Sequence, residues 1–109
     1  MCTTSTVWLD METGTERNLC RTEIDRDVSL EEIIMEKKGR IFQFATFMVR
    51  SDIFCQRPDW IQYFDVGDTP IAIYAATVGK VRMLADLTAV YRNHAQGSWS
   101  SQIEKDLSY

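Results

Sequence analysis

The chain has 109 residues, of which 45% are hydrophobic, 11% aromatic and 26% charged. This composition supports a folded core and excludes the low-hydrophobicity class of disordered proteins, and the length is typical of one domain, so residues 1–109 are expected to fold as a single unit. The net charge of −4 argues against direct binding to nucleic acid, because such affinity depends on neutralising phosphates with Lys and Arg.

The cysteine spacing and the length of the apolar runs indicate in which cellular compartment the protein is expected. Cys2, Cys20 and Cys55 are an odd number at unrelated spacings, unlike a disulfide scaffold or a zinc site. The N-terminus reads polar from the start, unlike a secretory leader, and no apolar run approaches the roughly 20 residues that span a bilayer. We therefore expect a cytoplasmic protein with reduced thiols and no membrane contact.

A β-hairpin is predicted at the N-terminal end. Thr3 to Met11 is rich in β-branched residues, and Glu16 to Ile24 alternates between its two faces. The residues between these two segments contain Gly14, which suits a turn that requires positive φ.

The next element is a helix with a complete start signal. Ser29 fits the N-cap position, and Glu32, three residues later, completes a capping box. Val28 and Ile33 form the matching hydrophobic staple, and Gly39 is expected to end the helix.

Two further strands are predicted in the middle of the chain. Ile41 to Val49 is apolar on both alternating faces, which is typical of a covered central strand, although a buried helix fits the same run. Trp60 to Val66 is again rich in β-favouring residues, and as an edge strand it would place Trp60 and Phe64 on one face and Tyr63 on the other.

Two interpretations are open for the segment after Gly67. Thr69 and Pro70 can open a helix as cap and first residue. The alternative is a strand through Ile71 to Ala75 followed by a helix from about residue 77 to residue 93, and the isoleucines of the first part favour it. Both interpretations predict a helix over Val81 to Tyr91, because apolar residues recur there at helical spacing.

A short helical tail is expected over residues 98–109. Ser101 and Glu104 form a second capping box, and Trp99, Ile103 and Leu107 lie on one side of the helix that follows. So short a helix needs a surface to dock on. The predicted fold is therefore α+β, an antiparallel sheet covered on one face by two to three helices.

The excess negative charge lies in residues 1–39, which hold nine acids and five bases. The acids nearest the predicted helix form a candidate acidic patch for a basic partner: Glu23, Asp25, Asp27, Glu31 and Glu32. A calcium loop would need a turn glycine and a later bidentate Glu at fixed spacing, so no metal site is expected there. The alternative for the same residues is a solvated strand end that leads into a helix.

Candidate catalytic groups are few. His94 is the one histidine, and it stands near the expected C-terminal end of a helix with no catalytic motif around it. We expect no catalytic residues, no metal and no cofactor.

The aromatic and apolar candidates are Trp60, Tyr63, Phe64, Trp99, Ile103 and Leu107. Large aromatic residues fill small cores and also dominate interface hot spots, so both roles are open.

These features favour a non-enzymatic protein-binding or inhibitor protein that acts through an acidic or aromatic surface, with a homodimer as one expected form. Small acidic proteins of mobile elements that block host defence or nucleic-acid enzymes have a similar composition, which is an analogy and not a motif. The alternatives are a small ligand-binding or enzymatic domain with a Tyr, Trp, Asp and His pocket, and a structural subunit of a larger assembly.

Overall fold

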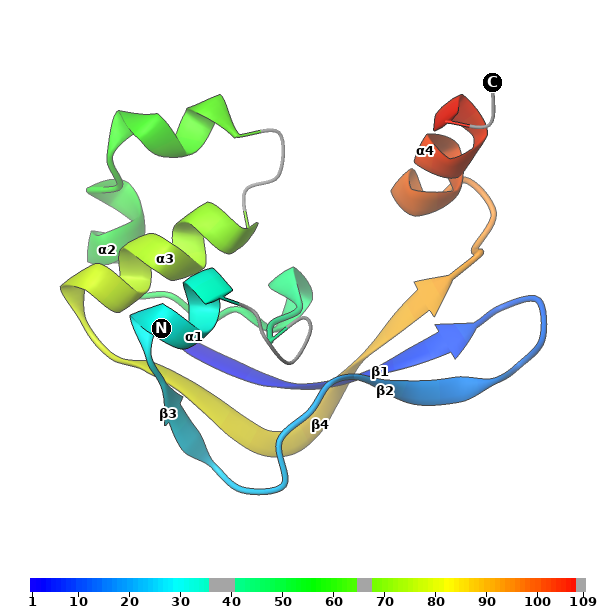
Figure 1. The fold of residues 1–109 in the computed structure, drawn as a ribbon, viewed down its shortest axis with the longest axis horizontal. Helices are drawn as coiled ribbons and strands as arrows, with labels where there is room; N and C mark the ends of the chain where they lie inside the picture. The colour runs from blue at the N-terminus through cyan, green and yellow to red at the C-terminus, as the bar shows by residue number, and fades with distance from the viewer. Residues whose placement is uncertain (36–40, 65–67, 108–109) are drawn as a thin grey trace.

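The computed structural model describes residues 1–35, 41–64 and 68–107, without the side chains of residues 99, 100, 104 and 105. Its elements in chain order are β1 (Cys2–Asp10), β2 (Glu16–Cys20), β3 (Arg26–Val28), α1 (Leu30–Met35), the 3-10 helix η1 (Phe44–Thr46), α2 (Ser51–Cys55), the 3-10 helix η2 (Asp59–Tyr63), α3 (Asp68–Val78), β4 (Val81–Asn93) and α4 (Trp99–Leu107). Strands and helices pack together in one small domain, which confirms the α+β class (Figure 1).

The four strands form one sheet in the order β2-β1-β4-β3. β1 pairs antiparallel with β2, and β3 pairs antiparallel with β4, but the central pair of β1 and β4 is parallel. The prediction of an antiparallel sheet is therefore right for the two outer pairs and wrong for the central pair, and the sheet is mixed. Parallel neighbours require a long crossover connection, and the helical segment between β3 and β4 provides it.

The N-terminal hairpin is confirmed. The amide of Gly14 donates to the carbonyl of Asp10 over 2.8 Å, and Gly14 adopts a φ of 72°, as expected for the turn. β2 ends at Cys20 and does not continue to Ile24, which is exposed.

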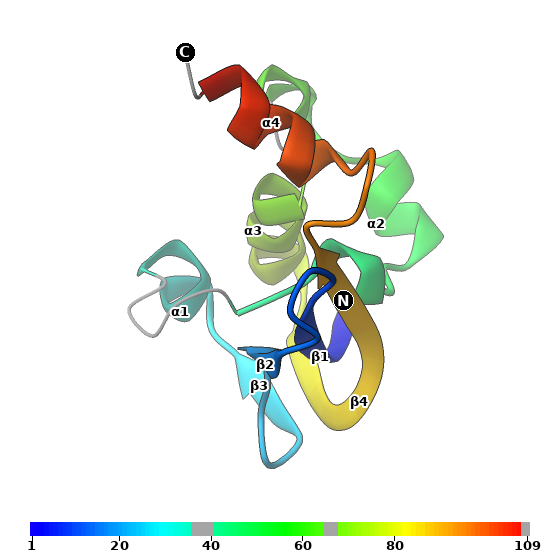
Figure 2. The ribbon, with the colours of Figure 1, turned by 90° about the vertical axis from the view of Figure 1, so that its right-hand side faces the viewer.

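β4 is the longest strand, and it is strongly bent (Figures 1 and 2). Its register with β1 is interrupted, because Thr4 pairs with Leu84 whereas the next residue, Ser5, pairs with Leu87. The hydroxyl of Ser5 donates to the carbonyl of Leu84 over 3.3 Å, and Thr4 and Thr88 bond through their hydroxyls. Extra residues on one strand of a pair bend it. The helix predicted over this segment is therefore wrong.

The capped start of α1 is confirmed. The hydroxyl of Ser29 accepts the amide of Glu32 over 3.2 Å, and the Glu32 carboxylate accepts the amide of Ser29 over 3.4 Å. Val28 and Ile33 are both buried, as the staple predicts. The predicted end of the helix at Gly39 lies outside the described residues.

The core lies where α1 and α3 pack on β3 and the first residues of β4. Its buried members come from strands and helices alike: Cys20, Val28, Ile33, Phe42, Ala72, Ala75, Val81 and Met83. Farther along β4, Leu87 and Val90 are exposed. The expected covering of one face by helices therefore holds for this half of the sheet.

Both strands predicted between residues 41 and 66 are wrong. Residues 44–46 form η1, and η2 begins after Pro58, where a strand was expected from Trp60; Val66 lies outside the described residues. A strand needs a neighbour with free backbone groups. β2 occupies that edge of β1 only from Thr6 to Leu9, and beside the first residues of β1 the segment makes a single bridge, between Met48 and Cys2.

The choice between the two interpretations of the following segment is settled by α3. The helix that includes Thr69 and Pro70 in its first turn is right, and the favoured strand over Ile71 to Ala75 is wrong. Pro70 is buried, and the amide of Gly79 closes the last turn on the carbonyl of Ala75 over 3.0 Å.

The C-terminal helix is confirmed, but its start is not at Ser101. α4 begins at Trp99, and the Ser98 hydroxyl accepts the amide of Ser101 over 3.3 Å, so Ser98 is the capping residue. α4 stands apart from α1, α2 and α3, beyond the end of β4 (Figure 1). Across the described ranges, every helix is too short or too polar to cross a membrane.

Candidate functional site

Exposed aromatic side chains are concentrated in one stretch of the chain. In the described structure, all of them lie between residues 44 and 64: Phe44, Phe54, Trp60, Tyr63 and Phe64. We call this stretch, which contains η1, α2 and η2, the aromatic segment. Its helices α2 and η2 lie beside α3, at the end of the molecule away from α4, and η1 lies nearer the middle (Figure 1).

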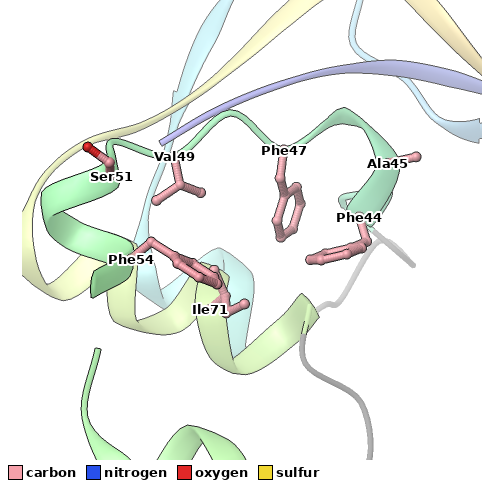
Figure 3. A pocket seen from close by; sticks show the side chains of 7 residues that line it. All are labelled: Phe44, Ala45, Phe47, Val49, Ser51, Phe54 and Ile71. Atoms are coloured by element: carbon pink, nitrogen blue, oxygen red, sulfur yellow. The ribbon is translucent and has the colours of Figure 1, made fainter. Parts of the chain in front are cut away.

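An open apolar groove runs between this segment and α3. Its volume is about 480 Å³, and it is lined by Phe44, Ala45, Phe47, Val49, Ser51, Phe54 and Ile71. The rings of Phe44, Phe47 and Phe54 converge with Ile71, whereas the hydroxyl of Ser51 points away (Figure 3).

Ring contacts join the groove to the core. Phe47 packs edge-on against the buried Phe42, with ring centroids 5.8 Å apart, and against Phe44 at 5.5 Å. On the other side, the hydroxyl of Tyr74 donates to the carbonyl of Gln56 over 3.2 Å, which ties the end of α2 to α3. The groove walls are therefore held by the core and not only by each other.

The charged residues around the groove are engaged with the segment itself. The Arg50 guanidinium donates two hydrogen bonds to the Asp52 carboxylate, at 3.1 and 3.2 Å, and these lower the pKa of Asp52 below its ordinary value. The guanidinium of Arg57 lies 4.2 Å from the ring centre of Phe54. The described residues that line the groove are apolar apart from Ser51, and such a lining suits binding of an apolar group.

The predicted aromatic residues lie on η2 and not on a strand. Trp60 and Phe64 contact each other edge-on at 6.0 Å, so they do share one side, while Tyr63 is 79% exposed. The buried residue of η2 is Ile61, which anchors the helix. Between the two roles left open by the sequence, this exposure favours a surface role over core filling.

The predicted acidic residues are dispersed among internal contacts. Asp25 accepts the amide of Ala85 over 2.8 Å, and Asp27 pairs with Arg82 over 3.0 Å. Glu32 pairs with Arg26 over 2.7 Å, and this hydrogen bond is the main reason why the pKa of Glu32 is lowered.

All five residues of the acidic set are exposed, but only two of them carry no ion pair or hydrogen bond among the described residues. These two are Glu23 and Glu31. The negative charge of the other three is partly neutralised or engaged in contacts within the domain.

The three C-terminal candidates lie on α4, away from the groove (Figure 1). Ile103 is half-buried and Leu107 is 79% exposed; the side chain of Trp99 is outside the described structure. At Leu107, therefore, α4 exposes apolar surface that the rest of the domain does not cover.

Sequence reasoning missed two features. The first is the exposure of Phe44 and Phe54. Phe44 belongs to a run that was expected to be a buried strand, and Phe54 belongs to a segment for which no element was predicted. The high density of aromatic residues in this part of the chain was the available signal. His94 was expected at a helix end, which is wrong: it follows strand β4 with a φ of 58°, and its Nδ1 lies 3.2 Å from the carboxylate of Asp10. The strand partner that brings these two residues together leaves no mark in the local sequence.

Comparisons with known proteins do not assign the chain to a family. No family model, no curated protein and no solved structure matches the chain. Its function is therefore inferred from the site itself.

Proposed function

We propose that this chain is a non-enzymatic protein-binding domain and that the aromatic segment is its binding surface. The supporting observation is that the exposed aromatic residues of the described structure all belong to residues 44–64. Exposed apolar patches of this kind mark interaction sites, because leaving them in water costs free energy that a partner recovers. Aromatic and Arg side chains are also the most frequent interface hot spots.

The groove supports a specific mode of binding. Its volume lies within the range of about 300–1,000 Å³ that is typical of ligand pockets, and its lining is apolar apart from one Ser. An aromatic or aliphatic side chain of the partner would be inserted between Phe44 and Phe54, and the exposed Trp60 and Tyr63 would contact the partner elsewhere on the aromatic segment. The stacked guanidinium of Arg57 would supply the polar rim contact.

The finer expectations from the sequence remain proposals. The partner is another protein, such as a nucleic-acid-binding one, and the chain would inhibit it in the cytoplasm. An origin in a mobile element, with a host defence or nucleic-acid enzyme as target, depends only on the acidic composition. The exposed Glu23 and Glu31 would steer a basic partner by long-range attraction.

An enzymatic pocket of Tyr, Trp, Asp and His residues is less well supported. A catalytic pocket needs convergent titratable groups, and none belongs to the part of the groove lining that the structure describes. His94 lies at the other end of the sheet, beside the β1–β2 turn.

A second candidate function, a subunit of an assembly or a homodimer, is favoured by the outer edge of β4. β3 pairs only with Val81 to Met83, and no other described strand pairs with that edge. The exposed Leu87 and Val90 lie on this uncovered part. An open strand edge is a template for pairing with another chain.

The test is a quantitative pull-down from the native host with the wild-type chain and matched variants. Tyr63→Ala and Phe54→Ala remove exposed rings of the aromatic segment, and Val90→Ala removes an exposed apolar side chain from β4. Loss of the same captured partner by the first two variants and its retention by Val90→Ala would support the proposal. Retention by all variants would place the binding surface elsewhere, and loss with Val90→Ala alone would favour the assembly function.

A further inference from the structure

Three metal-ligating side chains meet at the end of the sheet opposite the groove. Asp10 ends β1, Glu12 lies in the β1–β2 turn, and His94 follows β4. Their ligand atoms all lie within 4.8 Å of one another. The parallel pairing of Asp10 with Asn93 brings them together, because it places the hairpin turn beside the residue that follows β4.

Two of the three side chains are held by contacts within the domain, Asp10 by backbone amides and His94 by the carboxylates. The carboxylate of Asp10 accepts the amides of Glu12 at 2.8 Å and Thr13 at 3.4 Å, and its side chain is only 13% exposed. His94 is held with its Nδ1 toward both carboxylates, at 3.2 Å from Asp10 and 4.0 Å from Glu12. The Glu12 side chain is 71% exposed, so it can adjust to a ligand.

These separations match the ligand geometry of a transition-metal ion. Imidazole nitrogen and carboxylate oxygen bind Zn²⁺ at about 2.0–2.2 Å, so two ligands of one ion lie about 3–4.4 Å apart. The Nδ1 distances to the two carboxylates fall in this range. An imidazole in the donor set favours Zn²⁺ over Mg²⁺ and Ca²⁺, which prefer oxygen ligands alone.

We propose that Asp10, Glu12 and His94 form a binding site for a divalent transition-metal ion of the Zn²⁺ class, with Nδ1 of His94 as the nitrogen ligand. Solvent water would complete the coordination, since three ligands come from the residues that the structure describes. The ion would join the β1–β2 turn to the connection between β4 and α4. It would thereby fix the position of the residues that precede α4. The site is separate from the groove and does not depend on the proposed function.

The experiment is a titration of chelator-treated protein with Zn²⁺, followed by NMR of the imidazole nitrogens. The chain has one histidine, so these signals report on His94 alone, whatever the ion does at the cysteines. We expect a saturable shift of Nδ1. Glu12→Gln should weaken binding roughly tenfold or more, because it removes a ligand. Glu16→Gln is the matched control: it makes the same charge change on the same hairpin, outside the cluster, and should leave the affinity unchanged.

Calorimetry in a Cys2→Ser, Cys55→Ser background separates this site from thiol binding. His94→Asn should abolish the remaining heat, and Asn tolerates the positive φ that His94 adopts, so this variant is expected to stay folded. Circular dichroism checks the fold, and Glu12→Gln, which changes an exposed side chain, gives a second test. No imidazole shift at saturating Zn²⁺, or equal weakening by Glu12→Gln and Glu16→Gln, would overturn the proposal.

Discussion

The carboxylate of Asp25 lies 2.8 Å from the backbone amide of Ala85, sixty positions along the chain, and accepts its hydrogen. Ala85 is the first residue of β4 at which the register with β1 breaks, and it comes two residues after the last pairing with β3. The carboxylate therefore takes the place of a strand partner where the strand bends. An acid that the sequence suggested for a partner thus has a structural role.

Replacing Asp25 by Ala should lower the free energy of unfolding by about 1 kcal/mol, since an intramolecular hydrogen bond of this kind contributes about 0.5–1.5 kcal/mol. The measurement is urea denaturation of both proteins at neutral pH. Glu23→Ala is the control, because it removes a nearby exposed carboxylate that makes no side-chain hydrogen bond with the described residues. Equal losses in the two variants would mean that net charge, and not the bond to Ala85, sets the effect.

Ser29→Ala should destabilise the domain by roughly 0.5–2 kcal/mol, because the amide of Glu32 loses its acceptor at the start of α1. Ser29→Asp supplies another capping side chain and should retain most of the stability. Thermal and urea midpoints of the three proteins check this. If Asp at this position is as damaging as Ala, the cap does not determine the stability of α1.

The acid stability of the protein should depend in part on Asp10. The amide of Glu12, and then the side chain of His94, lower the pKa of Asp10 below its ordinary value of 3.8. A group with a lowered pKa in the folded state stabilises the fold above its unfolded pKa, and this contribution is lost as the pH falls through the folded pKa.

Asp10→Asn keeps an acceptor for the two amides but cannot ionise. It should therefore be less stable than the wild type at neutral pH, and the difference should vanish below the folded pKa, where the wild-type carboxyl is protonated. Urea midpoints at about pH 7, 5 and 2.5 follow this change. A difference that persists at the lowest pH would assign the effect to geometry and not to charge.

Local signals predicted the elements that short-range chemistry determines. The turn at Gly14, the capping box of Ser29 and Glu32, and the C-terminal helix are set by residues within a few positions of each other, and all three are present. The mistakes are at elements whose conformation depends on a distant partner.

β4 shows the cause most clearly. Its register with β1 skips Ala85 and Asp86 and then Thr88, so the alternation expected of a strand is broken. The apolar residues before and after these bulges then recur at three- and four-residue spacing, which imitates a helix. Residues 81–93 form a strand and not a helix because they pair with β1, which lies about eighty residues earlier in the chain.

The candidate site could be predicted in composition but not in shape. Trp60, Tyr63 and Phe64 were recognised as candidate surface residues, and they are exposed. The groove requires that Phe44 and Phe54 face Ile71 from three different helices, which no local pattern encodes. The distance between Asp10 and His94 likewise follows from the parallel pairing and not from spacing.

α4 gives the last prediction, because it stands apart from the other helices while Leu107 remains 79% exposed (Figure 1). Removing residues 98–109 should leave a folded domain, since none of the core residues that the structure describes belongs to this stretch. The apolar side of so short a helix needs a surface to dock on, and the proposal is that a second copy or a partner provides it.

Far-UV circular dichroism, the thermal midpoint and the light-scattering mass of the full and truncated chains test this. The expected result is a cooperative transition in both chains and a lower mass, or lost partner binding, after truncation. Leu107→Glu in the full-length chain should have the same effect on mass or binding with little effect on stability, because the side chain is exposed, whereas Gln102→Glu on the same helix adds the same charge and should have none. If truncation abolishes the cooperative transition, α4 is part of the folded core of the domain. If mass, binding and stability are all unchanged, α4 does not dock on a second copy or a partner.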